Sequence, residues 1–175
     1  MKDLKIQPEL CMGCRSCEIA CAVAHSKTKA LFSALGEKPS PKKRITVEHI
    51  PAAQMSIPIT CRQCENAPCV LVCPTKALSQ DADTGFVSHN PEHCVDCWTC
   101  STVCPRLVSL YHLILVIGCW SSSMKYNHWV IGTRTEAGVK CDLCEGRDLP
   151  ACVEACPTHA LVFSEIKNEK LSLIG

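Results

Sequence analysis

The sequence has 175 residues and is short of several features that point to common classes of protein. Charge of one sign is not in excess, because 18 basic residues face 17 acidic ones and the formal net charge is +1. We therefore expect no nucleic-acid or other polyanionic partner. There is no glycine period and no heptad, and 47% of the residues are hydrophobic. These three observations exclude collagen, a coiled coil and intrinsic disorder.

Signatures of catalysis and of membrane insertion are missing as well. We find no nucleophile paired with a base, no glycine-rich phosphate loop and no flavin or nucleotide fingerprint, so we expect no enzyme activity in the chain alone. Residues 1–8 contain neither the apolar core of a signal peptide nor a twin arginine. The apolar run at 107–120 contains a histidine and is shorter than the ~20 residues that cross a bilayer. We expect no transmembrane span and a cytoplasmic location, with any membrane association made through a partner.

Cysteine, in contrast, is abundant, with 17 residues. Short cysteine-rich chains are usually secreted disulfide scaffolds. Here the count is odd, and the cysteines stand in tight runs that are too close to pair within a run without strain. We interpret them as reduced thiols that bind metal.

The spacing of the cysteines separates iron from zinc. Structural zinc sites use two distant C-x2-C pairs that close a tetrahedron. Three cysteines at two-residue spacing, a fourth after three more residues and then proline form the run that ligates 4Fe–4S clusters in bacterial ferredoxins. The chain has four runs of this general kind: Cys11, Cys14, Cys17 and Cys21; Cys61, Cys64, Cys69 and Cys73; Cys94, Cys97, Cys100 and Cys104; and Cys141, Cys144, Cys152 and Cys156.

The runs are internal repeats, and their spacing predicts two modules. Runs two and three stand close together around a hairpin signal at 81–85, so 58–105 is predicted to be one two-cluster module. Runs one and four then form the other module, from 1–57 and 106–175. The fourth cysteine of a run ligates the cluster of its partner run. The predicted ligand sets are Cys11, Cys14, Cys17 with Cys156; Cys141, Cys144, Cys152 with Cys21; Cys61, Cys64, Cys69 with Cys104; and Cys94, Cys97, Cys100 with Cys73.

The predicted fold class is α+β: two interleaved, loop-rich modules of the bacterial-ferredoxin type held by four 4Fe–4S clusters. The fourth cysteine of a run is expected to start a helix, with the following proline in its first turn. Run one lacks that proline, but 18–25 is rich in helix formers and is predicted to be helical. Segment 26–57 is predicted to be a linker over the module surface, with a short strand at 45–47.

The sequence also resembles a known family. It is similar to the four-cluster ferredoxin-type electron-transfer subunits that serve formate dehydrogenases, hydrogenases and molybdopterin oxidoreductases. This resemblance covers 1–105 and 137–165 and includes the run Lys140-Cys141-Asp142-Leu143-Cys144. Within the group, the stretches 11–27, 31–33 and 41–44 look most like the iron–sulfur proteins of carbon-monoxide dehydrogenases.

The resemblance implies an electron-transfer subunit of an oxidoreductase complex in anaerobic metabolism. The implied donor is a nickel–iron carbon-monoxide dehydrogenase, and the implied acceptor is a hydrogenase or another reductase. The alternative within the group is an electron-transfer subunit of the same kind in a formate dehydrogenase, a formate hydrogenlyase or a molybdopterin oxidoreductase. The alternative from another class is a structural or regulatory module with zinc in four-thiolate sites.

The resemblance fails over 106–136. Three interpretations of this insert stand side by side: an enlarged hairpin, a local frame slip in the source sequence, and an apolar element that docks on a partner or on a membrane surface. Cys119 lies in the insert without run spacing, so we expect a spare buried thiol there and not a ligand.

Four cubanes per chain predict about sixteen iron and sixteen sulfide ions in anaerobically purified protein, because each cluster holds four of each. Such protein should be brown, whereas a zinc protein is colourless. A content of about eight irons would contradict the prediction, since it leaves two runs without clusters.

Overall fold

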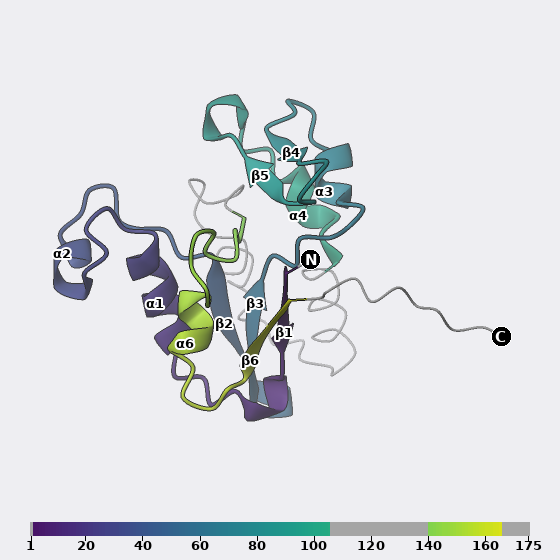
Figure 1. Cartoon of the computed structure of the whole chain (residues 1–175). Helices are drawn as coiled ribbons and strands as arrows, with labels where there is room; N and C mark the ends of the chain where they lie inside the picture. The colour runs from purple at the N-terminus through teal and green to yellow at the C-terminus, as the bar shows by residue number, and fades with distance from the viewer. Residues whose placement is uncertain (1, 106–139, 166–175) are drawn as a thin grey trace.

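The computed structural model describes residues 2–105 and 140–165. Its helices and strands are short, and loops connect them (Figure 1). The elements, with η for 3-10 turns, are β1 (Lys2–Ile6), η1 (Pro8–Leu10), α1 (Ser16–Ala24), α2 (Leu31–Leu35), β2 (Ile45–Ile50), η2 (Pro51–Ala53), β3 (Met55–Thr60), α3 (Pro68–Leu71), β4 (Leu78–Gln80), β5 (Val87–His89), η3 (Pro91–His93), α4 (Thr99–Thr102), α6 (Ala151–Glu154) and β6 (Leu161–Glu165). The cysteines of the described residues lie in the connecting loops and in the helices α1, α3, α4 and α6.

The strands of the described residues form three antiparallel pairs: β1 with β6, β2 with β3 and β4 with β5. The chain is therefore a small protein of mixed helix and sheet, as the predicted fold class requires. Over 2–105 and 140–165, no helix combines the length and the apolar character that a bilayer crossing demands. The insert over 106–136, its apolar run and Cys119 lie outside the described residues.

The first group of elements joins segments from the two ends of the sequence. β1 pairs with β6 so that Leu4 lies opposite Phe163 and Ile6 opposite Leu161. α1 packs against α6, and the β2–β3 hairpin lies beside them (Figure 1). The apolar core of this group buries nine residues, four of which are cysteines: Leu4, Cys17, Cys21, Ile45, Val47, Cys141, Leu143, Cys152 and Leu161.

The second group comprises β4, β5, α3 and α4, which gather in a separate part of the molecule (Figure 1). The predicted hairpin is confirmed: β4 and β5 pair on either side of a turn in which Asp81 accepts hydrogen bonds from the backbone of Asp83 and Thr84. Its core is small and consists of Ala67, Leu78 and Val87, with cysteines packed at its margin.

The two groups repeat one arrangement. The sequence Cys-Pro-Thr-x-Ala-Leu leads into β4 at residues 73–78 and into β6 at residues 156–161. In the second group the Asn90 N–H donates to the Ala77 carbonyl oxygen at 2.8 Å, and in the first the Gln7 N–H donates to the Ala160 carbonyl oxygen at the same distance. β5 and run three therefore correspond to β1 and run one, although the sequence order of the halves is reversed.

Two expectations differ from the structure. Segment 26–57 is more than a surface linker: the predicted strand at 45–47 extends to Ile45–Ile50 and pairs with β3, and Ile45, Val47 and Ile50 are buried. Its alternating apolar side chains make it part of the core. The fourth cysteines Cys73 and Cys156 also do not start helices, because α3 and α6 end just before them. The three residues between the third and the fourth cysteine of these runs belong to a helical turn, which ends before the fourth cysteine.

Gln63, between two cysteines of run two, links the two groups. Its side chain is 5% exposed. Its Oε1 accepts a hydrogen bond from the Val87 N–H in β5 at 2.7 Å, and its Nε2 donates to the Cys141 carbonyl oxygen in run four. One buried amide thus satisfies a backbone donor of one group and a backbone acceptor of the other.

Substituting Gln63→Leu should lower the free energy of unfolding by about 2 kcal/mol or more, because two buried backbone groups lose their only described partner and each costs about 1–3 kcal/mol. Anaerobic denaturation followed by the cluster absorbance measures the change. Gln54→Leu is a matched control, because Gln54 is exposed and has the same left-handed backbone conformation as Gln63. Equal midpoints for the two variants would contradict a bridging role for Gln63.

Candidate metal centres

The loops that carry the cysteines bend through left-handed backbone conformations. In run one Gly13 and Arg15 have positive φ, and in run three the equivalent residues Asp96 and Trp98 do too. A residue with a side chain avoids this region at a cost of about 1–2 kcal/mol. The repeated strain indicates that the loops are shaped to turn several sulfur atoms toward one point.

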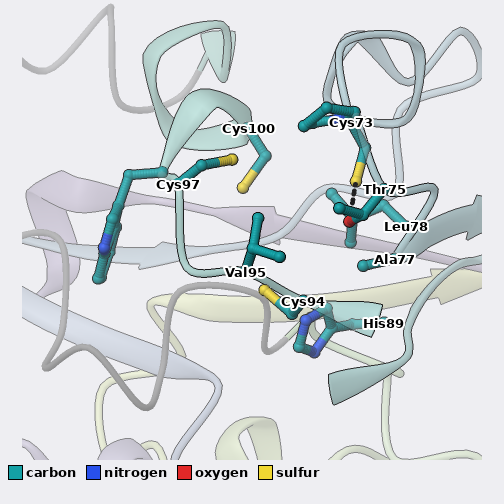
Figure 2. Close-up of a pocket in the computed structure, with 11 residues that line it drawn as sticks. Cys73, Thr75, Ala77, Leu78, His89, Cys94, Val95, Cys97 and Cys100 are labelled. Atoms are coloured by element: carbon teal, nitrogen blue, oxygen red, sulfur yellow. Dashed lines mark hydrogen bonds between the residues drawn. The ribbon is translucent and has the colours of Figure 1, made fainter. Parts of the chain in front are cut away.

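Four thiols meet in one small cavity of the second group. Cys94, Cys97 and Cys100 of run three line it together with Cys73, the last cysteine of run two (Figure 2). The other walls are largely apolar and include Ala77, Leu78, Val95 and Trp98. The structure thus brings together the four cysteines of one predicted ligand set, and no carboxylate from residues 2–105 and 140–165 lines the cavity.

The first group brings Cys152 near Cys141, Cys144 and Cys21, another predicted set. Burial raises the pKa of the Cys152 thiol, and the charges of these three neighbours raise it further. Burial also raises the pKa of Cys141 to about 11. The raised pKa values of Cys141 and Cys152 disfavour their ionisation unless a cation compensates the charge, which fits a polynuclear iron site.

The remaining two sets are brought together less completely. Cys61 interacts electrostatically with Cys64 and Cys104, and Cys69 with Cys61 and Cys104. Burial first and Glu18 second raise the pKa of Cys17 to about 12, with smaller contributions from Cys11 and Cys14. Cys156, the predicted fourth member of that last set, packs against the same core as Cys11.

The two fourth cysteines at the hexapeptide repeats have matching surroundings. The Sγ of Cys73 lies 3.8 Å from the Thr75 Oγ1, and that of Cys156 lies 3.8 Å from the Thr158 Oγ1. Burial opposes ionisation at both, but hydrogen bonds from the backbone of Leu78 and Leu161 and from the threonines outweigh it, and the pKa of each thiol is lowered. These donors favour thiolate at both positions, as metal ligation requires.

A polar network that the sequence did not predict joins run one to run four. The His25 Nδ1 lies 2.7 Å from the Cys21 carbonyl oxygen, and its Nε2 lies 3.0 Å from the Asp142 carboxylate. The Arg44 guanidinium forms an ion pair with the same carboxylate, and the Arg44 N–H donates to the Cys21 Sγ at 3.2 Å. Asp142 also accepts from the Cys144 N–H at 3.0 Å, so it fixes the loop between two predicted ligands.

The network shifts the pKa of its members. The pKa of His25 is raised from 6.5 to about 10, first by its hydrogen bond to Asp142 and second by its hydrogen bond to Cys21. Burial opposes ionisation of Asp142, but His25 and Arg44 outweigh it and lower the pKa of this carboxyl. Near neutral pH the network therefore consists of two cations that share one carboxylate.

Cysteine spacing did not reveal three residues that contact the cysteine runs: Gln63, His25 and Arg44. The one available signal was the Asp in the Lys-Cys-Asp-x-Cys run, since a carboxylate between two thiol ligands needs a cationic partner. Neither that partner nor the hydrogen bonds of His25 can be read from spacing.

Comparison with known proteins gives the class. A family model described as "4Fe-4S dicluster domain" matches residues 52–112. The chain is 41% identical over 164 residues to the electron transport protein HydN of Escherichia coli, covering 93% of this chain and 87% of HydN. It is 36% identical to an iron-sulfur protein of Rhodospirillum rubrum, over 95% of this chain and 83% of that protein. Protein NrfC of Escherichia coli is 32% identical, over 91% of this chain and 63% of NrfC.

The chain belongs to the family of 4Fe–4S ferredoxin-type electron-transport proteins. Within it, the chain is an iron–sulfur electron carrier and not a catalyst, as the sequence predicts.

The His25–Asp142 pair predicts alkaline sensitivity. Since folding raises the pKa of His25 from 6.5 to about 10, the pair contributes its full stability below pH 6.5 and loses it as the pH rises through about 10. The denaturation midpoint of the wild type should fall between pH 7 and pH 10 more steeply than that of His25→Gln. His159→Gln, at an exposed histidine, should behave like the wild type. Parallel pH profiles for His25→Gln and the wild type would refute the pair's contribution.

Proposed function

We propose that the chain carries four 4Fe–4S clusters in two interleaved modules and conducts electrons between a catalytic oxidoreductase subunit and an acceptor. The observation that carries the proposal is the meeting of cysteines from different runs, above all Cys73 with Cys94, Cys97 and Cys100 in one cavity. Bound clusters supply reversible one-electron chemistry. The chain's residues provide thiolates, hydrogen bonds to sulfur and apolar walls that exclude water.

The proposed ligand sets follow the exchange of fourth cysteines between paired runs. One set is Cys94, Cys97, Cys100 with Cys73, and its module partner is Cys61, Cys64, Cys69 with Cys104. The other module comprises Cys141, Cys144, Cys152 with Cys21, and Cys11, Cys14, Cys17 with Cys156. In support, the first three sets have mutual contacts or electrostatic neighbours among the described residues, and β1–β6 pairing brings the ends of the outer module together.

The proposed donor is a nickel–iron carbon-monoxide dehydrogenase, and the proposed acceptor is a hydrogenase or another reductase. Residues 11–27, with 31–33 and 41–44, support this choice through their resemblance to the iron–sulfur proteins of such enzymes. A formate-oxidising molybdoenzyme or formate hydrogenlyase is the second candidate, because the cysteine runs themselves are shared by the wider group.

Mixing experiments discriminate the two donors. The anaerobic, fully loaded chain should be bleached by carbon monoxide with catalytic amounts of nickel–iron carbon-monoxide dehydrogenase, and not by formate with a molybdenum formate dehydrogenase. The reverse result selects the second candidate. Reduction by neither enzyme, in a chain that dithionite reduces, would reject both donors. Nickel and molybdenum analysis of the native complex is an independent check.

Exchange of fourth ligands makes Cys21→Ser informative. It should abolish the electron paramagnetic resonance signal that Cys141→Ser abolishes, because Cys21 is an electrostatic neighbour of Cys141 and Cys152. Cys21→Ser should keep the signal that Cys11→Ser abolishes. Cys156→Ser is the matched variant, and it should abolish the same signal as Cys11→Ser. If Cys21→Ser instead reproduces the spectrum of Cys11→Ser, runs one and four do not exchange ligands.

A further inference from the structure

The side chain of His89 has a buried ring nitrogen that forms no hydrogen bond with the described residues. Its Nε2 is shielded from solvent and has no hydrogen-bond partner among residues 2–105 and 140–165. The side chain lines the cavity that Cys73, Cys94, Cys97 and Cys100 share, and Figure 2 shows its ring near Cys94. A buried polar atom without a partner costs about 1–3 kcal/mol, so its presence calls for a hydrogen-bond partner, which is an acceptor where Nε2 carries the proton.

The side-chain acceptors that the described residues place in the cavity are few. Apart from His89, they are the four thiols and the Thr75 hydroxyl, which lies 3.8 Å from the Cys73 Sγ, and the other side chains, such as Ala77, Leu78 and Val95, are largely apolar. The Nε2 of His89 bonds none of these groups, so a sulfur atom bound within the thiol set is the acceptor that fits an N–H at this position. The four thiols already provide a complete ligand set for a cubane, so the imidazole is not needed as a metal ligand.

Comparison of the two repeated halves shows that only one of them has a ring nitrogen at this position. His89 pairs with Leu78 across the β4–β5 ladder, and Ile6 pairs with Leu161 across β1–β6. Leu78 and Leu161 end the two equivalent hexapeptides, so Ile6 is the counterpart of His89. Ile6 is an apolar side chain packed against the core. The same scaffold therefore carries an N–H donor in one module and none at the equivalent point of the other.

We propose that His89 donates a hydrogen bond from Nε2–H to a sulfur of the cluster held by Cys73, Cys94, Cys97 and Cys100, and thereby raises the reduction potential of that cluster. The proposal rests on the ligand set given under Proposed function. Reduction adds negative charge to the sulfur atoms, so a donor stabilises the reduced form more than the oxidised form. His89 is a positioning residue that adjusts the reduction potential of this cluster. An electron that passes along the proposed clusters is therefore held preferentially at this one.

The chain's own repeat supplies the test variant. His89→Ile, in the full holo chain, should keep all its iron and lower the midpoint potential of one cluster by about 59 mV, a tenfold change for a one-electron couple. Potentiometry monitored by electron paramagnetic resonance measures the shift. His89→Gln keeps an N–H donor and should shift less. His93→Ile is the matched control, because His93 is exposed beside Cys94, and it should leave every potential unchanged.

A reciprocal variant and an isotope label complete the test. Ile6→His should raise the potential of the cluster proposed at Cys11, Cys14, Cys17 and Cys156. Wild-type chain with ¹⁵N-histidine should show a weak nitrogen coupling to a reduced cluster that His89→Ile lacks. Full iron without a shift in His89→Ile overturns the proposal, as does an equal shift in His93→Ile. If His89→Ile loses iron, absence of a ¹⁵N coupling in the wild type overturns it instead.

The outcomes separate this proposal from the proposed ligand sets. A wild type that holds about twelve irons, with Cys73→Ser harmless, rejects the ligand set and this proposal with it. A fully loaded wild type with unchanged potentials in His89→Ile rejects the role of His89 alone.

Discussion

The rest of the structure depends on the burial of cysteine sulfur where other small proteins bury leucine and valine. Four of the nine residues in the larger core are cysteines, and further cysteines pack around its margin. Burial raises the pKa of Cys17 to about 12 and that of Cys141 to about 11, so these thiols do not ionise without a compensating cation. Iron that supplies this compensation also supplies free energy of folding, which couples metal loading to the fold. The short strands and the small size of every described helix except α1 are consistent with a fold that relies on metal binding for part of its stability.

The same plan is used twice, once within a continuous segment and once across the ends of the sequence. Both copies place a short helix, Cys-Pro-Thr-x-Ala-Leu and a strand against a second strand that leads into a cysteine run. Equal hydrogen bonds from Asn90 to Ala77 and from Gln7 to Ala160 close the two copies. Because the plan is shared, each departure from it stands out. His89 in place of Ile6 is a chemical difference between two sites that the backbone makes equivalent.

Polar side chains hold the copies and their loops in relation to one another. Gln63 reaches from run two to β5 and to run four, and Asp142 of run four contacts His25 and Arg44, which follow run one in the sequence. Each link has one end within two residues of a cysteine, because Gln63 lies between Cys61 and Cys64 and Asp142 lies beside Cys141. These hydrogen bonds thus lie next to thiols that we propose as cluster ligands.

Cysteine spacing by itself predicted the class of cofactor, because ligation geometry constrains neighbours two and three residues apart and is therefore local. The electron-transfer role followed from the resemblance to a known family, and the grouping of the runs into two modules stays a prediction. The helix at 18–25 and the hairpin around 81–85 followed from equally local signals. Tertiary structure alone decided the rest. The 26–57 segment entered the core because Ile45 and Val47 pack in one cluster with side chains from both ends of the chain, such as Leu4 and Leu161. The partners of Gln63 and Asp142 lie 78 and 117 residues away, and the orphan nitrogen of His89 exists only where a strand faces the thiols. Such contacts arise from packing between distant segments, for which a single sequence carries no periodic or spacing signal.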